Sequence, residues 1–503
     1  MRTHPKFTKL RYLLTEIEDL YRAAALLHWD LQTYMPPKGI EARGRQLATL
    51  NKIAHEKFTN GTIAQLVDDL TVYEHELPYD SDEASLIRLT RRNCALASKV
   101  PTEFEARLSL LQTECYQAWV TARSENNFRL VQLTLERMLD MSREYSSFFP
   151  EARHIADPHI AASDYGMSAE SIRTVFAELR TELVPLVEAI TSQLPVDNSC
   201  LHQHFSEAEQ LAFCRSVLKR VGYDLKRGRQ DKTLHPFMTK FSIDDVRIAT
   251  RVYENDLSQG LFSTIHELGH ALYELGNDPE LEGTPLEGGV SSGVHESQSR
   301  LWENLVGRSR SFWRYFYPQL QAYFPNQLGT VPLEAYYRAI NRVDCSLIRT
   351  DADEITYNLH VMIRFDLELD LLEGKLAVKD LPAAWNERYL SDLGVASDND
   401  NDGVLQDVHW YTVQIGGMFH GYTLGNLMSA QFFDAAIAAY PEIPDRIENG
   451  DFTVLHDWLQ ANIYCHGRKF TAAETVERLT GRQISVQPLM NYIRRKYTDL
   501  YEI

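Results

Sequence analysis

The stretch STIHELGHALYEL, residues 263–275, holds two histidines and a glutamate at a spacing that could bind a metal ion. Residues four apart share one face of a helix, so His266 and His270 can offer ring nitrogens to a single cation. Zinc accepts such nitrogens at about 2.0–2.1 Å, and a catalytic zinc takes three protein ligands and a water. Because Glu267 lies roughly 100° around the helix from His266, we expect it to take a proton from that water rather than to bind the metal. This is the HExxH helix motif of zinc peptidases.

A third protein ligand is needed, and the residues after His270 narrow the choice. Tyrosine and glycine stand at positions 273 and 276, so no third histidine follows six residues later. The apolar-periodic stretch SGVHESQSRLWENLVG offers Glu296, and Arg300 one turn later could hold its carboxylate. Glu303 lies one heptad further on, and we expect it to be a solvated carboxylate. Poorer candidates in a loop containing proline and glycine are Glu280, Glu282 and Glu287.

The composition is that of an ordinary globular protein with an acidic surface. The chain has 44% hydrophobic and 24% charged residues, and its formal net charge is -19 at pH 7. Such a charge repels phosphate backbones and anionic headgroups, so we expect neither nucleic acid nor a membrane as a partner. The first residues, MRTHPKFTKL, lack the apolar stretch of a signal peptide. Six scattered cysteines without a C-x-x-C pair predict free thiols, which favours a cytoplasmic location.

Helical periodicity dominates the chain. Apolar residues recur at helical spacing in 128–141 and 175–190, and we expect well over half of the residues to be helical. Residues 245–253, DVRIATRVY, alternate apolar and polar side chains, which predicts a strand just before the His266 helix. No linker or composition shift marks a boundary. We therefore predict one catalytic unit over 1–503, made of an N-terminal helical part (1–230), a metal-binding catalytic core (231–430) and a C-terminal helical part (431–503).

Further motifs occur in a fixed order around the histidine helix. They are HWDLQTYMPPKGIEARGRQLATL (28–50), HPF (235–237), D-x-R at Asp245 and Arg247, HESQ (295–298), IRTDAD (348–353), GVLQDVHW (403–410) and HGRKFTAAE (466–474). With these motifs the chain resembles the thermostable carboxypeptidase Taq family of metallocarboxypeptidases over most of its length. Several spaced motifs in this order are more specific than the HExxH motif alone.

The resemblance implies a large, mainly helical zincin-type fold with a deep active-site groove and a small β-sheet next to the zinc helix. It also implies a homodimer that removes single amino acids from the C-termini of peptides with broad specificity. The cofactor would be Zn²⁺, although Co²⁺ or Mn²⁺ suits the same ligands. The chain departs from the family at Ala249, where threonine is usual, and at His420, where we do not expect a histidine.

An enzyme that acts at a C-terminus must recognise a carboxylate, for which the guanidinium fork of arginine is suited. Arg349 and Arg247 are the candidates, and both lie inside family motifs. A structural salt bridge to Asp351 or Asp353 is the alternative for Arg349, and a solvent-facing position on a strand is the alternative for Arg247. His235, in the HPF motif, is a further candidate for binding substrate.

Peptide hydrolysis also needs a donor for the oxyanion that develops. Tyr422, in the glycine-rich segment GGMFHGYTLG, and His409 are the candidates for this catalytic role. Each is also consistent with an ordinary core residue. Apart from this role, the strand at 247–250 could pair with the backbone of a substrate by strand addition.

Other functions use parts of the same pattern. A zinc oligopeptidase that cuts internally needs the same metal site. A di-iron oxidoreductase is built on paired Glu-x-x-His motifs, which the chain has at Glu267–His270 and at Glu151–His154. That hypothesis leaves His266 without a purpose. A non-catalytic helical binding protein would carry the HExxH motif by accident.

Overall fold

The computed structural model of the chain describes residues 4–502, and helices make up 68% of it. This confirms the expected mainly helical class with a small sheet. The helices that precede the sheet are α1 (Pro5–Thr33), α2 (Ile40–Thr59), α3 (Thr62–Asp69), α4 (Thr71–His75), α5 (Asp82–Lys99), α6 (Thr102–Glu125), α7 (Arg129–Ser147), α8 (Asp157–Ser163), α9 (Ala169–Thr191) and α10 (Glu207–Val221). The helices expected at 128–141 and 175–190 correspond to α7 and α9.

The sheet is followed by the helices that carry the predicted site. They are α11 (Leu257–Leu275), α12 (Ser292–Arg300), the π-helix η4 (Leu301–Val306), α13 (Arg310–Tyr323), α14 (Pro325–Leu328), α15 (Leu333–Ile340), α16 (Thr356–Leu372), α17 (Leu381–Leu393), α18 (His409–Thr412), α19 (His420–Ala439), α20 (Ile443–Glu448), α21 (Thr453–Asn462), α22 (Ala472–Thr480) and α23 (Gln487–Tyr501). No described helix has both the length and the apolar content needed to cross a membrane.

The sheet has the order β1-β3-β2, with β1 (Gln230–Lys232) parallel and β2 (Phe237–Ser242) antiparallel to β3 (Asp245–Thr250). The strand expected before the metal helix is therefore β3, and Val246 and Ile248 are its buried positions. The proposal that 247–250 pairs with a substrate is wrong, because both edges of β3 are already occupied by β1 and β2.

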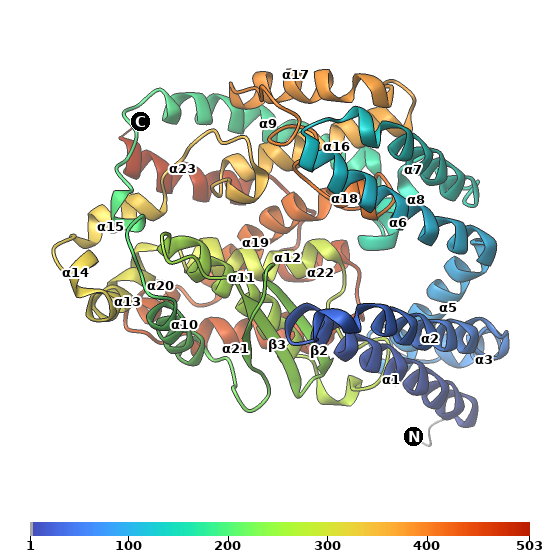
Figure 1. Cartoon of the computed structure of the whole chain (residues 1–503). Helices are drawn as coiled ribbons and strands as arrows, with labels where there is room; N and C mark the ends of the chain where they lie inside the picture. Colours follow the sequence, from blue (N-terminus) through green and yellow to red (C-terminus); the bar gives the residue numbers. More distant parts are fainter. Residues whose placement is uncertain (1–3, 503) are drawn as a thin grey trace.

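The sheet lies between α11 and α1, so it supports the helix that carries the two histidines (Figure 1). The helices α1, α3 and α5 pack around a small core of their own, which Leu281 and Leu286 complete. One larger core runs through the sheet and the helices from α6 onward.

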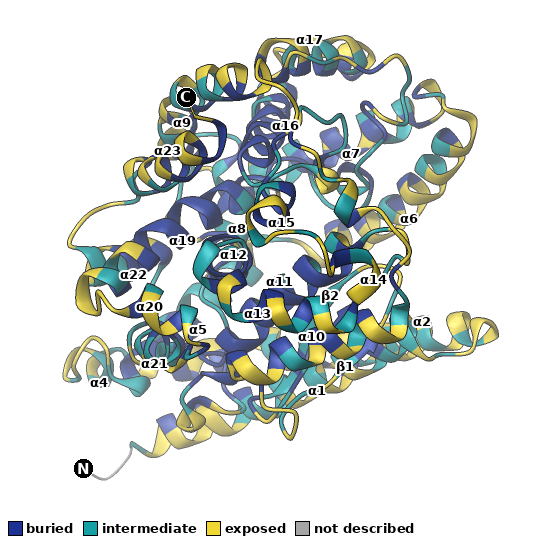
Figure 2. Cartoon of the chain, turned by 90° about the vertical axis from the view of Figure 1, so that its left-hand side faces the viewer, coloured by how far each residue is buried: buried dark blue, intermediate teal, exposed yellow. Residues whose placement is uncertain are grey.

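Close helix crossings bring the site-bearing helices together. A β-carbon at Gly269 on α11 would lie 2.5 Å from the carbonyl oxygen of Gln298 on α12. A β-carbon at Gly293 on α12 would lie 2.8 Å from Cε of Met428 on α19. Glycine at these two positions lets three helix backbones approach closely. All three helices are largely buried in the middle of the molecule (Figure 2).

Candidate metal centre

The structure brings together His266 and His270 on α11 and Glu296 on α12. Each residue offers one ligand atom, and these atoms all lie within 4.8 Å of one another. Oε2 of Glu296 lies 3.5 Å from Nε2 of both histidines. A tetrahedral site with bonds of about 2.1 Å separates its ligands by about 3.4 Å, so the spacing fits a zinc-sized cation. Among residues 4–502, this is the cluster of three metal-ligating side chains that the geometry identifies.

The two histidines of the cluster differ in their electrostatic surroundings. Burial lowers the pKa of His266, but Glu296 and Glu303 outweigh this and raise it above its ordinary value. Burial and the nearby His295 hold the pKa of His270 well below its ordinary value, so this ring is neutral and free to donate a lone pair. Two imidazoles and one carboxylate are a donor set that suits zinc.

Glu296 is held in place from two sides. Arg300 donates from Nε to Oε1 of Glu296 at 2.7 Å, as the sequence predicts for this pair. Ser299 donates its hydroxyl to Oε2 at 3.1 Å. The helix that carries Glu296 begins at a capped end, where Asp164 accepts from the backbone N–H of Gly293 at 2.8 Å. These contacts leave Oε2 facing the two histidines.

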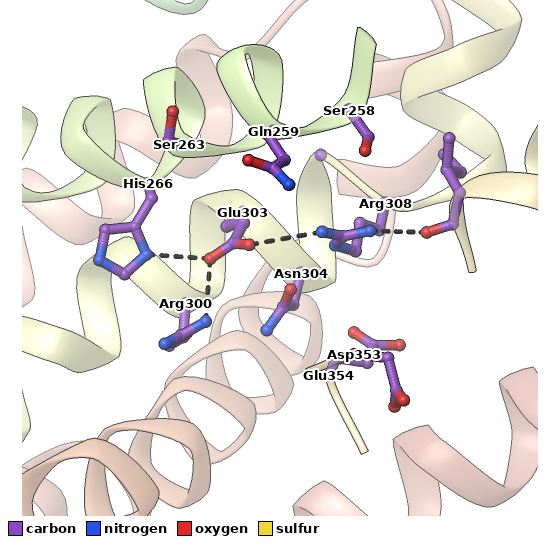
Figure 3. Close-up of polar contacts among 12 residues, drawn as sticks. Ser258, Gln259, Ser263, His266, Arg300, Glu303, Asn304, Arg308, Asp353 and Glu354 are labelled. Atoms are coloured by element: carbon purple, nitrogen blue, oxygen red, sulfur yellow. Dashed lines mark hydrogen bonds and ion pairs between the residues drawn. The ribbon is translucent and has the colours of Figure 1, made fainter. Parts of the chain in front are cut away.

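Glu303 is a functional candidate that the sequence analysis placed wrongly. We expected a solvated carboxylate, but Glu303 is 9% exposed and its Oε2 accepts from Nδ1 of His266 at 2.9 Å. Arg300 and Arg308 lie 3.1 Å and 3.5 Å from its carboxylate (Figure 3). A carboxylate behind a ligand histidine fixes the ring's tautomer and orientation. The seven-residue spacing from Glu296 was the available signal, because it returns to the same helix face.

Glu267 lies beside the cluster with its side chain free. It is 7% exposed, and its carboxylate makes no hydrogen bond to any residue from 4 to 502. Burial raises the pKa of Glu267 to about 7, with the Glu296 carboxylate adding to the effect and His266 opposing it. A carboxylate poised near neutrality next to a cation site is suited to general base chemistry.

Arg349 is buried near the metal cluster, and its acidic partner differs from both residues considered from sequence. Its Nε and Nη2 donate to Asp407, and its Nη1 donates to the hydroxyl of Tyr357 at 3.0 Å. Three of the five N–H groups of the guanidinium are thereby used, which leaves one on each terminal nitrogen. The ring of Tyr357 also lies 4.3 Å from the guanidinium of Arg300, which links Arg349 to the metal cluster.

Tyr422 and His409 lie next to Arg349. The Tyr422 hydroxyl is 3.5 Å from Nε2 of His409, and the guanidinium of Arg349 is 5.3 Å from the Tyr422 ring. Burial raises the pKa of Tyr422 above its usual value, so its hydroxyl keeps its proton and can donate. The structure thus gathers three of the predicted substrate or catalytic side chains beside the metal cluster.

Arg247 and His235 are not part of this group. Arg247 forms two hydrogen bonds to Asp245, and its guanidinium lies against the rings of Trp29 and Phe241, 4.5 Å and 4.8 Å from their centroids. Side chains alternate along a strand, so Arg247 faces α1 whereas its neighbours enter the main core. His235 is exposed between β1 and β2. The structure brings neither residue to the metal cluster.

The second Glu-x-x-His pair does not join the metal cluster either. Glu151 and His154 lie between α7 and α8, and Nε2 of His154 contacts Glu373 at 2.6 Å. The arrangement therefore differs from that of a di-iron bundle, in which two such pairs face one another.

Comparison with known proteins gives one consistent result. A family model described as carboxypeptidase Taq (M32) metallopeptidase matches residues 9–497. Thermostable carboxypeptidase 1 of Thermus thermophilus is 40% identical, over 96% of this chain and 97% of that protein. Carboxypeptidase 1 of Bacillus subtilis is 33% identical, over 97% of each.

Solved structures agree with the sequence relatives. The crystal structure of the M32 carboxypeptidase from Deinococcus radiodurans R1 is 46% identical and superposes with a TM-score of 0.97, over 99% of this chain and 100% of that chain. The Pyrococcus furiosus carboxypeptidase structure designated Apo-Mg is 29% identical, with a TM-score of 0.95 over 98% of this chain and 99% of that chain.

Proposed function

The chain belongs to the carboxypeptidase Taq (M32) family of metallopeptidases, and we propose that it removes single amino acids from the C-termini of peptides with broad specificity. Family membership makes it a peptidase that works with a divalent metal. The observation that carries the finer proposal is the convergence of His266, His270 and Glu296 beside the buried carboxylate of Glu267.

His266, His270 and Glu296 would hold the cation, and zinc is the metal that their donor set fits best, with cobalt or manganese as alternatives. When bound, such a cation polarises the scissile carbonyl and lowers the pKa of water in the site. Glu267 accepts the proton of the attacking water on a carboxylate oxygen and then passes it to the leaving amine. Its burial beside the three candidate ligands supports both steps, because the carboxylate is placed to take a proton from water in the site and to release it to the amine.

Arg349 is the residue we propose for binding the terminal carboxylate of the substrate. Its two unused N–H groups can bind a carboxylate while Asp407 and Tyr357 hold the guanidinium in place. The neighbouring Tyr422 and His409 supply donors for the oxyanion that develops at the scissile carbonyl. Arg247 has less support as a substrate ligand, because its guanidinium contacts two aromatic rings and pairs with Asp245. His235 has none from its contacts.

Peptides with a free or an amidated C-terminus test the proposal. We expect release of the last residue from the free peptide, little cleavage of the amidated peptide, and loss of activity after chelation. Internal cleavage of both peptides would instead identify an oligopeptidase. Iron in place of zinc in the purified protein would point to an oxidoreductase. The family resemblance also leads us to propose a homodimer in the cytoplasm, which size-exclusion chromatography and cell fractionation test.

A further inference from the structure

A third histidine, His295, contacts His270 on the ring nitrogen that faces away from Glu296. Nδ1 of His270 lies 2.6 Å from Nδ1 of His295, and Nε2 of His295 lies 2.9 Å from Oε1 of Glu274. Nε2 of His270 faces Glu296, so a cation there would take its lone pair and leave the ring proton on Nδ1. His270 then donates to His295, and His295 donates from Nε2 to the Glu274 carboxylate.

Glu274 is a fixed acceptor at the far end of this chain of contacts. Its Oε2 accepts from Nζ of Lys240 at 2.5 Å, and its Oε1 also accepts from the backbone N–H of Gly289 at 3.0 Å. The Lys240 and Glu274 side chains are 4% and 7% exposed. Burial disfavours the charge on Glu274, but Lys240 and His295 hold its pKa well below its ordinary value. Glu274 therefore remains an ionised carboxylate, which can accept hydrogen bonds but cannot donate them.

Packing fixes the ring of His295 independently of its hydrogen bonds. Its centroid is 4.5 Å from that of His270 and 5.5 Å from that of Tyr273. A β-carbon at Gly289 would lie 2.4 Å from Cδ2 of His295, so any side chain there would displace the imidazole. These neighbours border the ring on the sides of His270, Tyr273 and Gly289.

The two candidate ligand histidines are therefore supported in different ways. His266 receives a carboxylate directly, from Glu303. The carboxylate of Glu274 lies one turn past His270 on the same face of α11, and His295 lies between the two. We propose that His295 is a positioning residue, which relays the Glu274 carboxylate to His270 and fixes that ring in the tautomer and orientation that a cation needs. This inference rests on the metal site of the proposed function.

The affinity of the apoprotein for Zn²⁺, measured in competition with a chelator, tests the relay without using catalysis. His295→Phe keeps a ring of similar size and removes both polar contacts, so we expect zinc binding to weaken by about 10- to 100-fold. His295→Gln keeps an acceptor for His270 and a donor for Glu274, so we expect it to stay within about threefold of the wild type.

Two further variants complete the experiment. His456→Phe on α21 is the matched control, because its side chain is 27% exposed against 23% for His295 and it lies outside the site. It should bind zinc like the wild type. Gly289→Ala displaces the His295 ring without removing a polar group, and it should weaken zinc binding even if His295→Phe fails to fold.

Three results would overturn the inference. The first is zinc binding by His295→Phe as tight as that of the wild type. The second is His295→Gln binding as weakly as His295→Phe. The third is unchanged zinc binding by Gly289→Ala. If the wild-type protein bound no zinc, the proposed metal site would fail, and the relay with it. Tight wild-type binding that is insensitive to position 295 would remove the relay alone.

Discussion

Gly425 on α19 lies directly against Glu296 on α12. A β-carbon at position 425 would stand 2.6 Å from Cγ of Glu296 and 2.7 Å from its Cβ, which is closer than real β-carbons come to other atoms. Glu296 can therefore reach the two histidines because the facing helix offers only backbone at this point. The place of the third candidate ligand depends on a residue far away in the sequence.

Gly425→Ala should push Glu296 away from the histidines. An overpacked methyl group costs about 1–3 kcal/mol. If that cost falls on the metal-bound state, zinc binding weakens by about 5- to 150-fold. Zinc titration of the apoprotein measures the effect. Gly44→Ala on α2 is the matched control, since a β-carbon there meets nothing within 4 Å, and it should leave zinc binding unchanged. Equal affinities for the two variants would contradict this account of the crossing.

Glu267→Gln should separate metal binding from catalysis. The amide keeps the size of the side chain but cannot take a proton, so we expect peptide hydrolysis to fall by about 10²- to 10⁴-fold. Zinc binding should stay close to that of the wild type, because Glu267 is not among the three clustered ligands. Steady-state kinetics and zinc content of the same preparation measure both quantities. A variant with zinc bound and near-normal activity would remove Glu267 from the mechanism.

Arg349→Lys should impair recognition of the terminal carboxylate. Lysine keeps the charge next to Asp407 but loses the fork, and losing one charged hydrogen bond of about 1.5–3 kcal/mol lowers kcat/KM by about 10- to 150-fold. Arg45→Lys provides a surface control, because Arg45 is 69% exposed and pairs with Glu41 on α2. Peptides with a free C-terminus measure the effect. If both lysine variants lost equal activity, Arg349 would have no special role.

The stability of the protein should depend on pH through Glu368. Burial raises the pKa of Glu368 from 4.5 to about 7, and its Oε1 accepts from Trp410 at 2.9 Å. Between these pH values the unfolded chain has lost the proton that the native protein still holds. The free energy of unfolding therefore falls as pH rises through this window, by up to about 3 kcal/mol.

Glu368→Gln removes this titration. We expect the variant to gain up to about 3 kcal/mol relative to the wild type between pH 4.5 and 8, measured by urea unfolding. Glu188→Gln, at an exposed position on α9, should show no such gain. A constant difference between wild type and Glu368→Gln across this range would contradict the assignment.

The spacing of residues along the sequence was sufficient to predict the metal cluster. It was not sufficient to predict the side chains that hold the three ligands in place. The four-residue spacing of His266 and His270 and the following helix with Glu296 predicted three side chains that the structure brings within ligand distance of one another. Glu303 is buried because it pairs with Arg308 and with His266 from another helix. Its position on its own helix was therefore not enough to predict whether it is solvated. The burial and the ion pairs of such a carboxylate depend on residues from other helices, which its own helix position does not reveal.

The same limit applies to the sheet and to Arg349. Alternation in 245–253 predicted a strand, but strand order is a long-range property, and β3 proved to be central rather than at an edge. For Arg349, the nearby Asp351 and Asp353 were considered as partners, whereas the partner is Asp407. A pair such as Arg349 and Asp407 cannot be recognised from sequence spacing, because only the packing of several helices brings the two residues together.

Locating the bound metal ion in crystals decides whether the three proposed ligands hold it. Crystals of the wild-type protein grown with Zn²⁺, measured on both sides of the zinc absorption edge, reveal the ion by its anomalous signal. We expect one peak about 2.0–2.2 Å from Nε2 of His266, Nε2 of His270 and Oε2 of Glu296. A zinc ion bound to other residues, or crystals of active enzyme with no peak at these three atoms, would contradict this expectation.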